Sequence, residues 1–373
     1  MDKEQMKKDP EPWEFRAKPA WQRLIIMLGG VVVNLFLGIF IYSMTLYVYG
    51  DKYLPNENIK DGIWCVDKLA KTIGFQNGDK IISADGVKVE RYEEILEKII
   101  VSNTITVERD GVIIPITIPT DVIAQFLEND NRQLVYVRIP TIVGEVTAAN
   151  AKKGGLKEKD LIKAINGIDY TYFDEFKVGL SNYSDKYVDL TIMRNEEERN
   201  LKILVSNEGL LGFDAYISDY DELETLNIYS FSSIKYGFFA SFPAGYNKAI
   251  KKLGSYITQF KKILSPSTGA YKGVGGFKGI GSLFPDQDNF NWKDFWNLTA
   301  LLSLMLAFMN ILPIPALDGG HVLFLIYEMI IGKPAPEKFM QYATMVGIFL
   351  LLGLMVYANG NDFDLWEKIS SIF

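Results

Sequence analysis

The chain has 373 residues, 48% of them apolar, and a net charge of −7 at neutral pH. This length suggests roughly two to four domains, and the apolar content predicts a few membrane spans around a soluble insert. The acidic balance, with no basic stripe that interleaves aromatic residues, argues against a nucleic-acid partner. Cys65 is the one cysteine, so a disulfide within the chain is excluded and the redox compartment is not indicated.

Three apolar runs are long enough and poor enough in charge to cross a bilayer, at residues 24–49, 295–317 and 339–361. Residues 1–23 and the loop 318–338 carry basic residues, which favour the cytoplasmic side. The N-terminal segment and this loop are therefore predicted to be cytoplasmic. The region between the first two spans and the C-terminal tail are predicted to be periplasmic or external. A charged stretch precedes the first span, which is too long for a signal peptide.

An internal repeat occupies the region between the first two spans. The segment 74–87 aligns with 155–168, and four pairs match at a constant offset: Gly74/Gly155, Asp79/Asp160, Ile81/Ile162 and Gly86/Gly167. Each copy reads as a loop, a short strand, a tight Asp-Gly or Asn-Gly turn, a helical stretch and two further strands. Two similar α+β domains are predicted, at residues 60–120 and 141–213.

Two segments follow the repeat. Residues 229–264 are rich in aromatic residues and lysine, and are predicted to form one or two amphipathic helices along the membrane surface. Packing of these helices against the second repeat copy is an equally open alternative. Residues 273–280 are rich in glycine but lack the ending of a phosphate-binding loop, so a close approach of the backbone, for example to a substrate strand, is expected there.

The pattern N-x-x-P-x-P-x-L-D-G-G-H runs from Asn310 to His321, at the end of the second apolar run. An aspartate at this depth is costly unless it is paired or binds a metal, which makes Asp318 a candidate for a functional site. A proline- and glycine-broken helix whose aspartate faces a partner helix is the purely structural alternative. His321 is the one histidine of the chain, whereas a hydrolytic zinc site usually takes two histidines among three protein ligands.

This motif resembles the second signature of the site-2 proteases, which are intramembrane zinc metalloproteases, and the likeness is greatest to the RseP-like branch. The segment 15–23, followed by Gly29, Gly30 and Asn34, is similar to the family's sequence before and within its second helix. Val31 stands where many members have proline. The resemblance implies a helical membrane protein in which three of the four expected spans are present. It also implies that the repeat forms two tandem PDZ-like domains outside the membrane, although Lys159 departs from the glycine that such domains favour.

The resemblance further implies Zn²⁺ as cofactor, with Asp318 as its third ligand. The positions near the substrate would be Asn310, Pro313, Pro315, Gly319, Gly320 and, in a strand-like segment before the family's third helix, Gly275 and Gly276. Asn34 and His321 would be motif residues, and His321 is not expected to bind zinc. Pro313 and Pro315 are expected to break the helix and free backbone groups.

The H-E-x-x-H element, which supplies two ligands and the catalytic base in this family, is absent from the sequence. No catalytic residue can therefore be named in this chain. Two explanations are considered: that Met1 is an internal methionine of a longer protein, which is favoured, or that the chain is a catalytically inactive relative. In either case, the chain alone is expected to bind zinc poorly and to be inactive.

By resemblance, the complete protein would sit in the bacterial inner membrane and cut single-pass membrane proteins, such as anti-sigma factors. The alternative function is a non-catalytic membrane scaffold whose tandem PDZ-like domains bind peptide C-termini. A transporter is disfavoured, because three spans around a large insert show no inverted repeat.

Overall fold

The computed structural model describes the chain except for residues 1–10, 129–132, 217–219, 285–289, 364 and 367–373. Part of the predicted cytoplasmic segment 1–23, Met1 included, thus lies outside the described residues. The chain divides into two compact units. The helical unit comprises Met1–Asp51 with Ile234–Phe373, and the αβ unit comprises Lys52–Ser233.

Three helices of the helical unit are long and apolar enough to cross a membrane: α1 (Ala20–Tyr49), α10 (Trp292–Ile311) and α12 (Glu337–Asp362). The sequence therefore predicted the three candidate spans correctly. Helix α1 starts directly after Pro19 and stops at Gly50, whose φ of 69° ends the helical backbone.

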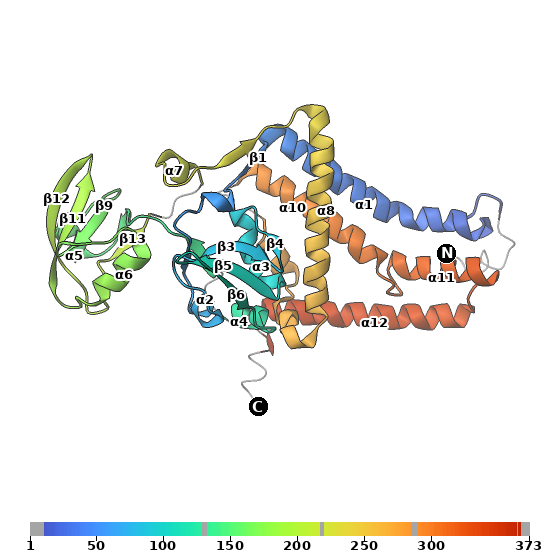
Figure 1. Ribbon diagram of the computed structural model, residues 1–373. Helices are drawn as coiled ribbons and strands as arrows, with labels where there is room; N and C mark the ends of the chain where they lie inside the picture. Colours follow the sequence, from blue (N-terminus) through green and yellow to red (C-terminus); the bar gives the residue numbers. More distant parts are fainter. Residues whose placement is uncertain (1–10, 129–132, 217–219, 285–289, 364, 367–373) are drawn as a thin grey trace. The chain divides into compact units, whose positions relative to one another are not determined.

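The second span ends earlier than the sequence suggested. Helix α10 stops at Ile311 instead of continuing to residue 317, because Pro313 and Pro315 follow and proline cannot continue the helical hydrogen-bond ladder. The predicted loop 318–338 was also wrong in part, since it contains helix α11 (Asp318–Ile331). Figure 1 shows α10 and α11 following one another along α1.

Small residues allow the helices of this unit to approach closely. Helix α8 (Phe238–Ile263) crosses α1 and α10 (Figure 1). A Cβ at Gly245 of α8 would lie 2.6 Å from the backbone nitrogen of Ser43 in α1. A Cβ at Gly38 of α1 would lie 2.8 Å from Leu304 in α10. Helix packing in a membrane depends on such small residues, because burial against lipid supplies little driving force.

Helix α8 lies within the segment 229–264 that was predicted to be helical. The helix begins only at Phe238, because residues 232–234 form a strand. The Lys248 ammonium lies 5.1 Å from the ring centre of Tyr42 and donates a 3.0 Å hydrogen bond to Asn297. Helix α8 is thereby attached to both α1 and α10, and its placement along a membrane surface stays a prediction.

The αβ unit contains two modules of the same design. The strand order is β4-β3-β5-β6 in the sheet of the first module and β10-β9-β11-β12 in that of the second. Each module adds a two-stranded sheet, β2-β7 or β8-β13, and each has its own buried apolar core. This shared topology corresponds to the repeat read from residues 74–87 and 155–168. The predicted limits of the two domains stay predictions.

The elements of the first module alternate strands with short helices. They are β2 (Ile63–Cys65), α2 (Lys68–Ile73), β3 (Lys80–Ala84), β4 (Val87–Lys88), α3 (Ile95–Val101), β5 (Thr104–Arg109), β6 (Val112–Thr117), α4 (Val122–Leu127) and β7 (Val135–Val137).

The second module repeats this order apart from the counterpart of α4. Its elements are β8 (Val143–Val146), α5 (Ala149–Lys153), β9 (Leu161–Ile165), β10 (Ile168–Asp169), α6 (Phe173–Ser181), β11 (Tyr187–Arg194), β12 (Glu197–Leu204) and β13 (Phe213–Ala215). The remaining elements are the paired strands β1 (Asp51–Tyr53) and β14 (Ser232–Ile234), with α7 (Tyr220–Thr225) and α9 (Phe277–Gly281).

Each of the two modules contains a buried ion pair at the same position of the repeat. Asp79 accepts hydrogen bonds of 2.7 and 2.8 Å from the guanidinium of Arg109, and Asp160 accepts two of 2.6 Å from Arg194. Each arginine also donates to the carbonyl of the matching glycine, Gly74 or Gly155 (2.8 and 2.7 Å). Both aspartate side chains are at most 1% exposed. The matched Asp and Gly of the repeat therefore brace the loop that leads into β3 or β9.

Candidate functional site

The motif residues lie at the break between α10 and α11. Asn310 is in the last turn of α10, and residues 312–317 form a tight turn before α11 begins. The Ile314 amide donates to the Leu312 carbonyl (2.7 Å), and the Leu317 amide donates to the Ile314 carbonyl (3.0 Å). Ala316 adopts a φ of 92°, a region that L-residues with a side chain rarely occupy. The turn is therefore locally strained.

Glycines allow this turn to pack against two helices. A Cβ at Gly319 would lie 2.2 Å from the Leu312 carbonyl oxygen, and a Cβ at Gly320 would lie 2.6 Å from that of Ile314. On α12, a Cβ at Gly347 would lie 1.5 Å from the carbonyl oxygen of Pro315. Residues larger than glycine cannot occupy these positions unless the backbone moves. The turn is thus held between the start of α11 and the middle of α12.

Asp318 is the first residue of α11 and is partly buried. Its Oδ2 lies close to α1, 3.8 Å from the position of a Cβ at Gly30. Within the described part of the chain, its carboxylate has no hydrogen-bond or ion-pair partner. The N-terminal end of a helix carries partial positive charge. Asp318 is therefore an acceptor that can still bind a cation or a donor.

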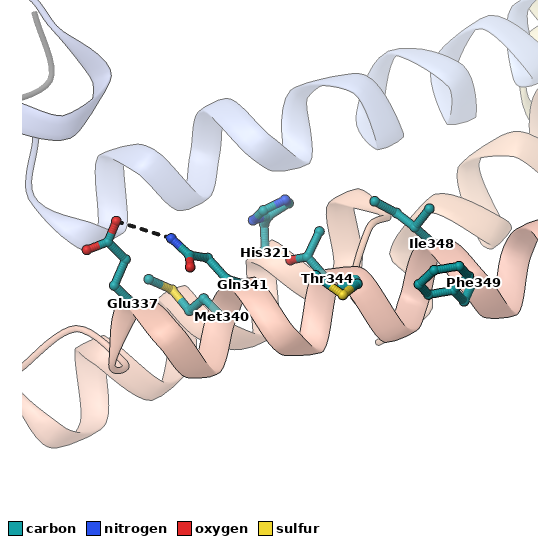
Figure 2. A pocket seen from close by; sticks show the side chains of 8 residues that line it. His321, Glu337, Met340, Gln341, Thr344, Ile348 and Phe349 are labelled. Atoms are coloured by element: carbon teal, nitrogen blue, oxygen red, sulfur yellow. Dashed lines mark hydrogen bonds between the residues drawn. The ribbon is translucent and has the colours of Figure 1, made fainter. Parts of the chain in front are cut away.

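His321 lies one turn after Asp318 and is exposed. It lines a groove of about 670 Å³ between α11 and α12, as Figure 2 shows. The α12 side of the groove is largely apolar, with Met340, Ile348 and Phe349, and is polar at one end, where Gln341 donates a 3.4 Å hydrogen bond to Glu337. The motif histidine thus points into an apolar groove beside Asp318.

Asn34 contributes through its backbone. Its carbonyl oxygen accepts a 2.8 Å hydrogen bond from the Ser303 hydroxyl of α10. Arg23, near the start of the same helix α1, forms an ion pair with Glu328 of α11. These contacts fix both halves of the broken helix α10–α11 against α1.

Gly275 and Gly276 lie in a different place from the motif. The predicted strand-like segment was wrong, because residues 274–276 are irregular and α9 follows at Phe277. A close approach of the backbone is present, and the neighbour is the end of α12. A Cβ at Gly276 would lie 2.6 Å from the Asn359 side chain, and one at Gly275 would lie 3.3 Å from Asp362.

We name this arrangement the α12 clasp. Asp362 accepts hydrogen bonds from the backbone amides of Lys278 (2.9 Å) and Gly279 (3.2 Å). Asn361 donates to the carbonyls of Lys272 (3.2 Å) and Val274 (2.9 Å). The polar end of α12 thereby satisfies first-turn amides of α9 and carbonyls of the irregular segment before it.

The residues that the structure describes do not form a metal site. They contain no group of three or more His, Cys, Asp or Glu side chains that could hold a metal ion. A zinc ion needs about four ligands, and the motif supplies one carboxylate. The donor set of residues 11–363 outside the undescribed gaps therefore does not fit zinc.

Two features of this region could not be found by reasoning from the sequence. Ala316 gives no signal, since alanine is not a residue expected at positive φ. The α12 clasp joins residues far apart in the chain. The run of Asn359, Asn361 and Asp362 at the end of an apolar helix was its one visible hint.

Comparison with known proteins decides the family. The model of Peptidase family M50, the site-2 protease family, matches residues 2–354. The chain belongs to Peptidase family M50. The resemblance read from Asn310–His321 is thereby confirmed, and the M50 family is zinc-dependent.

The chain spans only part of the length of three M50 relatives. A putative zinc metalloprotease of Campylobacter jejuni is 30% identical over 214 residues, which are 57% of this chain and 56% of the relative. Metalloprotease MmpA of Caulobacter vibrioides is 24% identical over 369 residues, 96% of this chain and 73% of the relative. Regulator of sigma-W protease RasP of Bacillus subtilis is 26% identical over 224 residues, 59% of this chain and 50% of the relative.

Proposed function

We propose that this M50 chain serves regulated intramembrane proteolysis, as part of a zinc-dependent endopeptidase that cuts single-pass membrane proteins. The observation that carries the proposal is the Asp318 carboxylate, which lies without a partner among the described residues at the positive end of α11, beside membrane-spanning helices. An unpaired carboxylate at this depth is costly, and binding a cation would compensate that cost.

The motif residues would act as follows. Asp318 would be one zinc ligand, held in place by the turn that Gly319 and Gly320 permit. Asn310, Pro313 and Pro315 would line the approach of the substrate, together with backbone groups freed by the helix break. A zinc ion completed by further ligands would supply an activated water and a Lewis acid for the scissile carbonyl. His321 would be a motif residue of the groove and not a zinc ligand.

A zinc site that includes Asp318 needs ligands other than the described residues, which hold no group of three or more His, Cys, Asp or Glu side chains that could bind a metal ion. Metal analysis of the purified chain tests this requirement. We expect far less than one zinc per chain, and no loss of zinc on replacing Asp318 by alanine. Stoichiometric zinc in the purified chain would contradict the proposed division of ligands.

Cleavage assays test the role of Asp318 itself. The protein encoded by the whole open reading frame, including any coding sequence 5′ of this chain, would be reconstituted in vesicles with a single-pass model substrate. Asp318→Ala should reduce cleavage by more than about 100-fold, the upper range for residues that only orient a metal ligand. Glu337→Ala, in the same groove region, is the matched control and should retain most of the activity. Unchanged cleavage by Asp318→Ala would overturn the proposal.

The proposed location and substrate class follow from charge and from the relatives. The relative RasP is named a regulator of sigma-W protease, and this link to a sigma factor supports anti-sigma factors as the proposed substrate class. We propose a multi-pass location in the bacterial inner membrane, with the N-terminus and the α11–α12 connection cytoplasmic. The αβ unit would then be periplasmic or external.

We further propose that the two modules are PDZ-like. Their shared strand order supports this assignment. In the second module, β13 pairs with β8 alone among the described strands. The ring of Phe213, in β13, contacts Phe173 and Phe176 of α6, at 6.4 and 6.1 Å between ring centres. An open strand edge beside a helix accepts an extended peptide by strand addition, so peptide C-termini are the proposed ligands.

A non-catalytic scaffold is the second candidate function, and the incomplete metal site favours it. The scaffold would present the same two modules to peptides without cutting them. The genomic sequence 5′ of the Met1 codon separates the two candidates. An in-frame apolar segment with H-E-x-x-H supports the protease, and an immediate in-frame stop codon supports the scaffold.

A further inference from the structure

The two modules of the αβ unit meet at one buried carboxylate. Asp174, in the first turn of α6, belongs to the second module, and its side chain is 4% exposed. A buried carboxylate is stable only when its charge and hydrogen-bonding capacity are satisfied. The donors that satisfy Asp174 do not come from the second module.

Among the described residues, the three hydrogen bonds to the Asp174 side chain come from residues of the first module or directly after it. Asn77, in the loop before β3, donates at 2.8 Å. Arg138, the residue after β7, donates through Nε at 3.1 Å and through a terminal nitrogen at 2.9 Å. The same guanidinium donates to Glu175 at 2.6 Å. The start of α6 is therefore held by the first module.

The donors are themselves fixed from the side of the first module. The Asn77 side chain accepts a 2.8 Å hydrogen bond from the backbone amide of Cys65 in β2. The backbone carbonyl of Arg138 accepts a hydrogen bond from the hydroxyl of Tyr229, a buried residue of the first core. Because both donors are held in this way, their positions relative to the Asp174 carboxylate are defined.

Apolar and backbone contacts add to the junction. The Phe173 ring lies edge-to-face on Trp64 of β2, with 5.6 Å between ring centres. The Phe173 amide donates a 2.9 Å hydrogen bond to the Ile139 carbonyl. The Arg138 guanidinium lies 3.9 Å from the centre of the Tyr172 ring. The last residues before α6 and its first turn are thus in contact with the first module on several sides.

We propose that Asp174 locks the two modules into one rigid body, so that they act as a single double module and not as two domains on a flexible linker. Because α6 also contacts Phe213 of β13, the lock fixes the β13–α6 surface, which binds peptides under the proposed function, relative to the first module. A ligand bound along α6 then acts on both modules together. The proposal concerns the αβ unit alone and does not depend on proteolysis.

Distances between spin labels on the full chain test the lock. Labels would be attached to Val87→Cys in the first module and Glu198→Cys in the second, both at exposed positions. Cys65 is buried and should not react with the label. The chain without added cysteines is the control for labelling at Cys65. Locked modules give one narrow distance distribution, and Asp174→Ala should broaden it at least about twofold, because unlocked domains move relative to one another by default.

The matched control is Asp160→Ala. Asp160 is also a buried carboxylate bound by one arginine, but its partner Arg194 lies within the second module. Its replacement should leave the distance distribution narrow in folded protein. Arg138→Met removes the lock from the other side, in case Asp174→Ala does not fold. A broad distribution in the parent chain, or a narrow one in folded Asp174→Ala or Arg138→Met, would overturn the proposal.

Discussion

The buried ion pairs of the repeat are the residues on which each module most depends. Asp160 is 1% exposed and bidentate with Arg194, so removing the carboxylate leaves a largely buried guanidinium without its counter-ion. Loss of one partner of a buried pair costs about 3–5 kcal/mol.

Asp160→Ala should therefore lower the protection of β9 and β11 amides from hydrogen exchange by an amount equivalent to that cost. Lys88→Ala removes an exposed pair with Glu57 and should change protection by less than about 0.5 kcal/mol. Equal effects of the two variants would contradict the assigned role of burial.

Burial in the fold suppresses the ionisation and the reactivity of the Cys65 thiol. Burial, reinforced by the nearby Asp79 carboxylate, raises the pKa of the Cys65 thiol from 9.0 to about 12. The folded state therefore favours the neutral thiol. This contribution to stability is complete below pH 9 and is lost as the pH rises toward 12, because the unfolded chain then gains the thiolate first.

Iodoacetamide at pH 8 should accordingly leave Cys65 unmodified in the native chain and alkylate it fully in denaturant. Mass spectrometry of the intact chain measures both states. Rapid alkylation of native protein would show that the β2 region opens readily.

At the scale of elements, the break between α10 and α11 depends on the glycine of α12 that covers it. A Cβ at Gly347 would overlap the Pro315 carbonyl, whereas Gly353, on the same helix, has nothing within 4 Å of its Cβ position. Gly347→Ala should separate α12 from the turn and lower the thermal unfolding temperature in detergent.

Gly353→Ala is the matched control and should leave that temperature equal or slightly higher, because alanine favours a helix by about 1 kcal/mol over glycine. Unfolding followed by intrinsic tryptophan fluorescence measures both variants. A Gly347→Ala chain as stable as the parent would mean that α12 is not seated on Pro315.

The elements differ in how far the sequence could predict them. The spans α1, α10 and α12 follow from length and lack of charge, because a bilayer imposes both. Helix α11 was missed, since its 14 residues are too few for a span and its glycines read as a loop. The matched Asp79 and Asp160 were visible in the repeat, but their arginine partners follow at different separations, 30 and 34 residues.

The candidate site was predictable only at the level of its motif. The pattern from Asn310 to His321 identified Asp318 and the glycines around it, and the family comparison supports that reading. Sequence patterns contain no information on which distant side chains meet. The Asp362 contacts with Lys278 and Gly279 and the Arg138 contacts with Asp174 could therefore not be predicted.

At the scale of the whole molecule, the proposed orientation can be tested with single cysteines. Val87 is 65% exposed in the αβ unit, and Lys333 is exposed in the connection between α11 and α12. In spheroplasts, a membrane-impermeant maleimide should label Val87→Cys without further treatment. It should label Lys333→Cys only after the membrane is permeabilised, because basic connections stay cytoplasmic.

Cys65 should not react with the maleimide in either variant, so the chain without an added cysteine is the control for background labelling. The reverse pattern of labelling would invert the proposed topology and place the αβ unit in the cytoplasm. Binding of periplasmic peptide C-termini by the modules would then be excluded.

The α12 clasp also has a consequence for biosynthesis. The ribosome delivers residues 272–279 well before it delivers Asn361 and Asp362, because synthesis runs from the N-terminus. Until the last turn of α12 has emerged, the amides of Lys278 and Gly279 lack the carboxylate that they contact in the finished molecule. The glycine-rich segment can therefore reach its final conformation only after the last turn of α12 has been synthesised and has reached it.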